Sequence, residues 1–316
     1  LGRWPIRRSY YADLLDILDQ AAVVGIDIIL SEPSEEDARL SSAITQHAKV
    51  VLPVYIDRQF NISNPAKAFS SAGLGHVHLE QGIDGFVKEV FHTISHQSDS
   101  IPSFASALNA VINSGKMPQP EIQDKIPQQK VFDNIIQSNN MWINFYGAPG
   151  TFQYFSVADI LDGQWPSSHF ADKIVLVGTT TAGLDEGILI PFTHGRDRMP
   201  AVEAHAHILN NLLDEGDIRP IGQWTRWTFA IVLAIFCFFM FIRFGSISGI
   251  LLGILSLLAI TLLTLGAFAA FNLWLSPASL YFSVGISFLL AYIFNLQKMK
   301  NYFFRPRKTG KNLLTQ

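Results

Sequence analysis

The chain of 316 residues contains a single cysteine, Cys237, so it cannot form a disulfide bond within itself and must rely on hydrophobic cores. Charged residues are also scarce, at 16% of the sequence against 49% hydrophobic residues. This balance is too apolar for an ordinary soluble chain and too polar for a chain that lies wholly in a membrane. It excludes intrinsic disorder, and the net charge of −3 disfavours nucleic acid as a partner.

Acidic residues are missing from the last third of the chain. All 26 lie before Trp227, and the segment from Trp227 onward carries seven basic residues and no acid. An acidic body is therefore followed by an apolar and basic end.

Three apolar runs occupy this end, at residues 227–244, 247–271 and 273–296. A helix needs about 20 apolar residues to cross a bilayer, and none of the runs has the polar face of a helix in a soluble core. We predict an all-α module of three transmembrane helices within residues 223–296, preceded by a domain at 1–222 and followed by a basic tail at 297–316.

Basic residues predict the orientation of these helices, because short loops rich in Lys and Arg stay in the cytoplasm. Arg243 follows the first run, the link at 272–274 is uncharged, and six bases lie in the tail. We therefore expect domain 1–222 outside the cytoplasm and the tail inside, in the cytoplasmic (inner) membrane of a bacterium.

The first domain alternates between helical and strand-like patterns. Helical spacing marks residues 9–21, 35–47, 103–113, 156–162 and 202–214, and buried apolar strands are expected at 23–30, 49–56 and 173–178, with a shorter strand at 142–146 and a hairpin over 75–94. This order predicts an α/β fold with a mainly parallel sheet and flanking helices.

Motifs that would carry catalysis or bind a cofactor are lacking. The glycine-containing loops at 147–151 and 178–183 have neither a Walker lysine nor G-x-G-x-x-G spacing, and the chain has no G-x-S-x-G motif. We expect no catalytic residue and no cofactor, so that this chain is not itself an enzyme.

The segment Glu203-Ala-His205-Ala-His207 is the best candidate for a metal cluster. On a helix Glu203 and His207 are neighbours, whereas His205 faces elsewhere. We therefore predict no metal site. Glu203 suits the first turn of a helix, where the macrodipole favours a carboxylate, and His205 suits the interface with the sheet.

Asp27 interrupts a run of Val, Ile and Leu, where a buried carboxylate needs hydrogen bonds or a raised pKa. Ligands of parallel sheets bind beyond the carboxyl ends of the strands. Two predicted strands end in polar residues that could line one crevice with Asp27, Glu203 and His205, or could simply cap the following helices: Ser31, Glu32, Thr179, Thr180 and Thr181.

Seven blocks in order resemble the second type of CHASE domain, an extracellular sensory domain associated with cyclases and histidine kinases. They run from GRWPIRRSYYADLLDIL and GIDIILSEPSEEDARLSSAI, through VVLPVYI, GLGHVHLEQGIDGFVKEV and INFYGAPGTFQYFSVADILDG, to FADKIVLVGTTTAGLDEG and AVEAHAHILNNLLDEGDIRP. The resemblance spans Gly2 to Pro220. It implies one membrane helix before the domain, three after it, and a cytoplasmic output domain beyond residue 316. Lys88, and the segment His76-Val77-His78, depart from the family pattern.

These observations predict the sensory input module of a membrane-bound receptor. We expect an unidentified small-molecule or envelope ligand, contact with the lipid bilayer, a homodimer, and an output such as a nucleotide cyclase, histidine kinase or diguanylate cyclase. Two alternatives stay open. One is an exported, membrane-tethered hydrolase that uses Asp27 with Glu203 or His205, and the other is a scaffold that binds envelope proteins.

Overall fold

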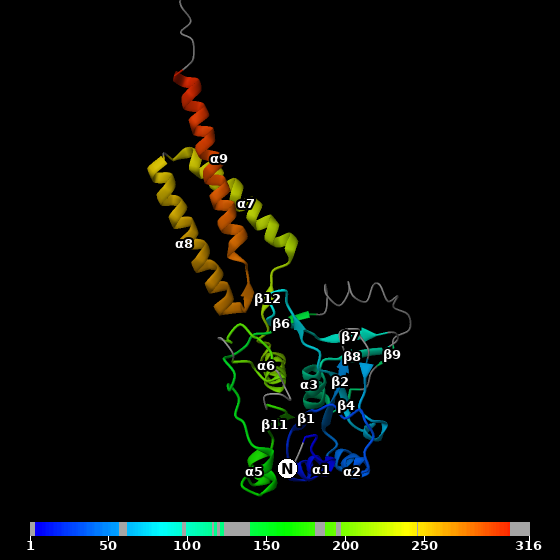
Figure 1. The fold of residues 1–316 in the computed structure, drawn as a ribbon. Helices are drawn as coiled ribbons and strands as arrows, with labels where there is room; N and C mark the ends of the chain where they lie inside the picture. The colour runs from blue at the N-terminus through cyan, green and yellow to red at the C-terminus, as the bar shows by residue number, and fades with distance from the viewer. Residues whose placement is uncertain are drawn as a thin grey trace, which may run out of the picture. The chain divides into compact units, whose positions relative to one another are not determined.

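The computed structural model describes residues 4–56, 62–96, 99–115, 117–118, 121–122, 140–180, 187–193, 197–244 and 246–303. The chain divides into two compact units, Leu1–Ile218 and Arg219–Gln316, which we call the sheet domain and the helical unit. Figure 1 shows the elements of each unit, coloured along the chain.

The central sheet of the sheet domain is built on β1 and β2. Parallel pairing joins β1 to β11 and to β2, and joins β2 to β4, whereas β3 pairs antiparallel with the end of β2. The five strands are β1 (Val23–Asp27), β2 (Val50–Ile56), β3 (Ile62–Ser63), β4 (Gly73–His76) and β11 (Ile174–Gly178).

Two smaller sheets are antiparallel, so the domain as a whole is a mixed α/β structure. One has the order β10-β6-β5 and the other β7-β8-β9. Their strands are β5 (Glu80–Gln81), β6 (Val87–Phe91), β7 (Thr93–His96), β8 (Asp99–Pro102), β9 (Glu121–Ile122) and β10 (Asn140–Trp142). Parallel pairing thus describes the central sheet and not the domain. The predicted hairpin survives only as the short β5-β6 pair, because Gly73–His76 joins the central sheet instead.

Helices cover both faces of the central sheet because its strands alternate two apolar faces. Val24 and Ile26 belong to a core with the first group of helices, and Val23 belongs to a core with the second. The first group comprises α1 (Arg8–Ile17), α2 (Asp37–His47), α5 (Val157–Leu161), η1 (Lys67–Phe69) and η2 (Ser167–Phe170), and the second comprises α3 (Phe104–Ser114) and α6 (Ala201–Asp214).

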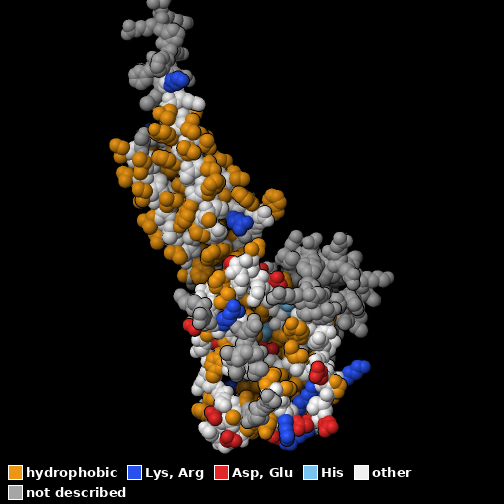
Figure 2. All heavy atoms as spheres, in the orientation of Figure 1, with side chains coloured by type: hydrophobic (Ala, Val, Ile, Leu, Met, Phe, Trp, Pro, Cys, Tyr) orange, Lys and Arg blue, Asp and Glu red, His pale blue; other side chains and the backbone are white. Residues whose placement is uncertain are grey.

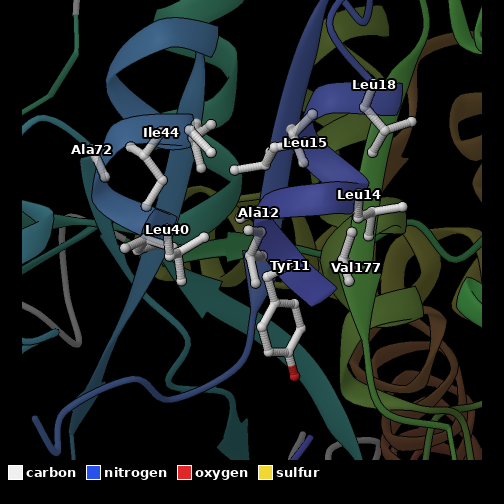
Figure 3. Close-up of a cluster of buried hydrophobic side chains, with 14 of the residues drawn as sticks. Tyr11, Ala12, Leu14, Leu15, Leu18, Leu40, Ile44, Ala72 and Val177 are labelled. Atoms are coloured by element: carbon white, nitrogen blue, oxygen red, sulfur yellow. The ribbon is translucent and has the colours of Figure 1, made fainter. Parts of the chain in front are cut away.

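The first core lies between α1, α2 and the sheet, as Figure 3 shows. Leu14, Leu15 and Leu18 project from one side of α1 at helical spacing, and Leu40 and Ile44 do the same on α2. Each buried aliphatic side chain of this size contributes about 1.5–3 kcal/mol. This core fixes the two helices on the sheet.

The second face depends on glycines that let the helices approach the strands closely. A β-carbon at Gly75 of β4 would lie 2.6 Å from Cα of Phe104 in α3, and one at Gly178 of β11 would lie 2.6 Å from Cβ of Val202 in α6. At its start α3 is capped by Ser103, whose hydroxyl accepts a hydrogen bond from the backbone N–H of Ser106. It ends at Gly115, which has a φ of 65°.

Strand β11 is less buried than its apolar sequence predicts. It lies at the end of the strand order, with β1 as its one neighbour in the described sheet, and Ile174 is 37% exposed. The expectation of a strand buried on both faces was wrong here. An edge position leaves part of the strand uncovered.

The helical unit contains three helices long and apolar enough to cross a membrane, within Gln223–Arg243, Ile247–Phe271 and Pro277–Lys298. Hydrophobic side chains cover most of its visible surface in Figure 2. The elements are β12 (Arg219–Pro220), α7 (Gln223–Arg243), α8 (Ser246–Phe271), β13 (Leu273–Trp274) and α9 (Pro277–Phe303). The third helix begins four residues later than expected, because Leu273 and Trp274 pair with Arg219 and Pro220 instead.

A hydrogen bond joins the first and third helices of this unit. Ser287 of α9 is 2% exposed, and its hydroxyl hydrogen is shared between the carbonyl of Ala234 in α7, at 2.8 Å, and that of Ser283, at 2.7 Å. Between α8 and α9, the hydroxyls of Thr261 and Tyr281 lie 2.8 Å apart. These polar contacts fix the register of the helices where water is absent.

Replacing Gly75 with alanine tests the close approach of α3 to β4. The added methyl group meets backbone atoms of Phe104, which cannot rotate away, so Gly75→Ala should lower the free energy of unfolding of the sheet domain by about 1–3 kcal/mol. Thermal unfolding of the whole chain in detergent measures this loss. The control Asn113→Ala, exposed near the end of α3, should change stability by less than about 0.5 kcal/mol. Equal losses in the two variants would contradict the steric argument.

Candidate functional site

Two predicted site residues meet at the carboxyl end of the central sheet. Asp27 is the last residue of β1 and pairs with Gly178, the last residue of β11, so Thr179 follows directly beside it. The apolar run around Asp27 had suggested a position in the middle of a buried strand. Asp27 instead lies at the end of β1 and is only partly buried. The chain leaves the sheet after Asp27, so β1 is three residues shorter than the strand predicted at 23–30. Thr180 is exposed, and Thr181 lies outside the described residues.

Ser31 and Glu32 are exposed beyond the end of β1. The backbone carbonyl of Glu32 accepts a hydrogen bond from the guanidinium of Arg8, which also forms an ion pair with Asp37. These contacts connect the segment to the starts of α1 and α2.

Glu203 is held in place by donors from a loop that is distant in sequence. It is 3% exposed, and its carboxylate accepts hydrogen bonds from the backbone N–H of Gly150 at 2.9 and 3.0 Å and of Thr151 at 2.8 Å. The phenol of Tyr154 is the third donor, at 2.6 Å from the carboxylate. Glu203 therefore anchors the start of α6 to the 150–154 segment, beyond its expected place in the first helical turn.

His205 packs against α3 instead of the loop. Its ring is 1% exposed and meets the ring of Phe104 edge to face, with centroids 5.5 Å apart. Neither ring nitrogen has a hydrogen-bond partner among the described residues. Burial lowers the pKa of His205 to about 4, so the ring is neutral at pH 7.

His76, which the sequence did not single out as a site residue, is also fully buried. Its Nε2 donates to the carbonyl of Phe91 at 3.1 Å, and its Nδ1 has no partner in the described part of the chain. Burial, together with positive charge on His78, His205 and His92, lowers its pKa to about 3. The His-Val-His sequence was visible, but nothing in it showed which ring turns inward.

His207 lies among aromatic rings. Phe145 and Phe152 meet its ring edge to face, Tyr146 stacks on it, and the backbone N–H of Tyr146 donates to Nδ1 at 3.3 Å. Burial lowers its pKa, an effect that the negative charge of Glu203 opposes. Glu203 and His207 are thus neighbours on the helix, as their spacing predicts.

These residues do not form a metal centre. Within the described ranges, no group of three or more His, Cys, Asp or Glu side chains is placed to hold a metal ion. The carboxylate of Glu203 is occupied by the 150–154 segment, and His205 is inaccessible to solvent. What the arrangement offers chemically is a helix, α6, fixed on one side by the carboxylate of Glu203 and packed on the other through the uncharged imidazole of His205.

The chain combines an α/β domain with three helices that are long and apolar enough to cross a membrane. The family model of the CHASE2 domain matches residues 1–244, and the chain therefore belongs to the CHASE2 domain family, which provides sensory domains of signalling receptors. No curated protein and no solved structure matches the chain.

Removal of the Tyr154 hydroxyl tests the anchoring of α6. Tyr154→Phe deletes one donor to a buried carboxylate, so it should lower the unfolding free energy of the sheet domain by about 1.5–3 kcal/mol. Thermal unfolding of the full chain gives the shift. Tyr55→Phe is the matched control, because it removes a phenol hydroxyl from an exposed side chain of β2. A Tyr154 variant as stable as the control would mean that the backbone donors alone hold Glu203.

Proposed function

We propose that this chain is the input module of a membrane-bound signalling receptor. Its sheet domain binds a stimulus outside the cytoplasm, and its helices relay the change to a cytoplasmic output such as a nucleotide cyclase, a histidine kinase or a diguanylate cyclase. The observation that carries this proposal is the position of α6. It is the last helix of the sheet domain, it is buried along much of its length, and α7 begins within a few residues of its end.

The distribution of charge supports the orientation. Arg243 ends α7 and Lys298 and Lys300 lie near the end of α9, whereas the link around β13 is uncharged. Under the positive-inside rule the ends of α7 and α9 are cytoplasmic, which puts the sheet domain on the other side.

The packing of the helical unit supports a direct relay. α7 follows the sheet domain in the sequence and α9 leads into the basic tail, and the Ser287 hydroxyl joins these two helices. A shift of α7 along its axis or about it therefore strains a contact with α9 without passing through α8.

Hydrolysis is less well supported. A general acid or base must reach the substrate within hydrogen-bond distance. Glu203 and His205 are 3% and 1% exposed, and the oxygens of Glu203 already accept hydrogen bonds from the 150–154 segment. A hydrolase would need these side chains accessible to its substrate, whereas a sensory role does not require this.

Reporter fusions test the orientation. A reporter that works only in the cytoplasm should be active when it is fused after Lys311 and silent when it is inserted at Gln119. Activity is read in intact cells that contain equal amounts of each fusion. The opposite pattern would overturn the orientation and the sensory proposal with it.

A chimera tests the relay. The chain, placed behind an N-terminal membrane anchor, is joined after Gln316 to a cyclase domain, and cyclic nucleotide is measured per molecule in the membrane. Glu203→Ala frees the start of α6 and should change the output at least twofold, whereas the control Tyr55→Phe should not. A flexible Gly-Ser insertion after Ile221 should abolish the effect of Glu203→Ala. An output that ignores Glu203→Ala, or responds equally with the insertion, would contradict the relay.

A further inference from the structure

Three elements of the sheet domain bring histidine rings together around Phe104. His76 ends β4 and forms a bridge with Ser103, directly before Phe104. The ring of Phe104 contacts the ring of His205 of α6 edge to face. We call His76 and His205 the histidine pair, because positive charge on His205 acts on His76.

The histidine pair is poorly supplied with hydrogen bonds. Nδ1 of His76 and both nitrogens of His205 lack partners among the described residues, although these rings are 0% and 1% exposed. A buried polar group without a partner costs free energy, and native structures retain few of them. An aliphatic or aromatic residue would fill the position of His205 at lower cost, so its imidazole calls for an explanation beyond packing.

We propose that the proton is a stimulus of this domain, bound by His76 and His205 as α6 separates from α3 and β4. The inference rests on the proposed sensory function and names the ligand of that function. A proton needs no cavity and no entry path for a larger molecule, which suits two buried rings, one of which packs against an aromatic side chain.

The direction of the effect follows from the charges around the pair. His78, His92 and His205 face His76, and none of them supplies negative charge. Asp217 raises the pKa of His92, and Glu203 does so for His207, but neither is among the groups that shift His205. His76 also lies beside the start of α3, where the helix dipole disfavours a cation.

Protonation is therefore linked to opening. The pKa of His76 is lowered to about 3 and that of His205 to about 4, against 6.5 for a solvated ring. The packed arrangement keeps its full stability above about pH 6.5 and loses it as the pH falls from there toward these values. Between pH 7.5 and pH 5, each histidine should raise the population of the open arrangement by about 30-fold.

The pair also lies where an opening can be passed on. His205 is on α6, the last helix before the chain continues to α7, and Asp217 in the following segment acts on His92. The anchors Glu203 and Asn211, whose amide group exchanges two hydrogen bonds with the backbone of Asn144, oppose the separation of α6. The strength of these anchors therefore determines the pH at which α6 separates from α3 and β4.

Hydrogen exchange of the full chain in lipid nanodiscs tests the inference. Protection of α6 amides, corrected for the intrinsic pH dependence of exchange, should fall at least about 30-fold from pH 7.5 to pH 5 relative to α1. His205→Phe keeps the contact with Phe104, and His76→Gln keeps a donor for the carbonyl of Phe91. Each should reduce the fall, and the double variant should abolish it. His169→Gln, on η2, should behave as the wild type.

Two results would overturn the proton site. One is a double variant that loses α6 protection in acid as the wild type does, and the other is loss of protection that is as large in α1 as in α6. If one single variant fails to fold, the other still tests the proposal, because its loss of α6 protection in acid should be smaller than that of the wild type.

The cyclase chimera separates this inference from the sensory proposal. In proteoliposomes with the cyclase side held at pH 7.5, acid on the sheet-domain side should change the output in the wild type and not in the double variant. If α6 opens at the histidine pair and the output stays constant, the proton site stands and the relay fails. If the output responds to acid equally in the double variant, the relay stands and the proton site is wrong.

Discussion

The close approach of two helices to one face of the central sheet is the constraint on which the sheet domain depends. It is possible because glycine stands at Gly75 of β4 and Gly178 of β11, where any β-carbon would overlap Phe104 or Val202. The approach removes water from the space between β4, α3 and α6. In this space an ionised side chain is costly, which is why the rings of His76 and His205 are neutral.

Helix α6 carries two buried polar side chains that differ in their hydrogen bonding. Glu203 and His205 are two positions apart, so they project to nearly opposite sides of α6. Glu203 meets three donor groups of the 150–154 segment, whereas the ring of His205 meets Phe104 of α3 edge to face. Helix α6 is thus bound firmly on one side, and on the other it is held by contacts that require an uncharged ring.

The sequence predicted those features that rest on local periodicity. Residues 103–113 were expected to be helical and α3 is Phe104–Ser114, and the 202–214 helix is α6, Ala201–Asp214. Features that depend on contacts between segments distant in the sequence were not predicted. The antiparallel sheets, the edge position of β11 and the donation from Tyr154 to Glu203 each join segments whose pairing leaves no repeat in the chain. Membership of the CHASE2 family came from the order of seven blocks, and not from any single motif.

The length of α9 determines how the basic tail is presented. At 27 residues and 1.5 Å per residue the helix is about 40 Å long, which exceeds the roughly 30 Å hydrocarbon core of a bilayer. Its last turns carry polar and basic residues whose side chains are exposed: Gln297, Lys298 and Lys300. Because each added residue turns a helix by about 100°, the number of residues in this extension sets the rotational phase at which the tail leaves the membrane. This direction depends on the number of residues in α9 and not on any side chain in the sheet domain.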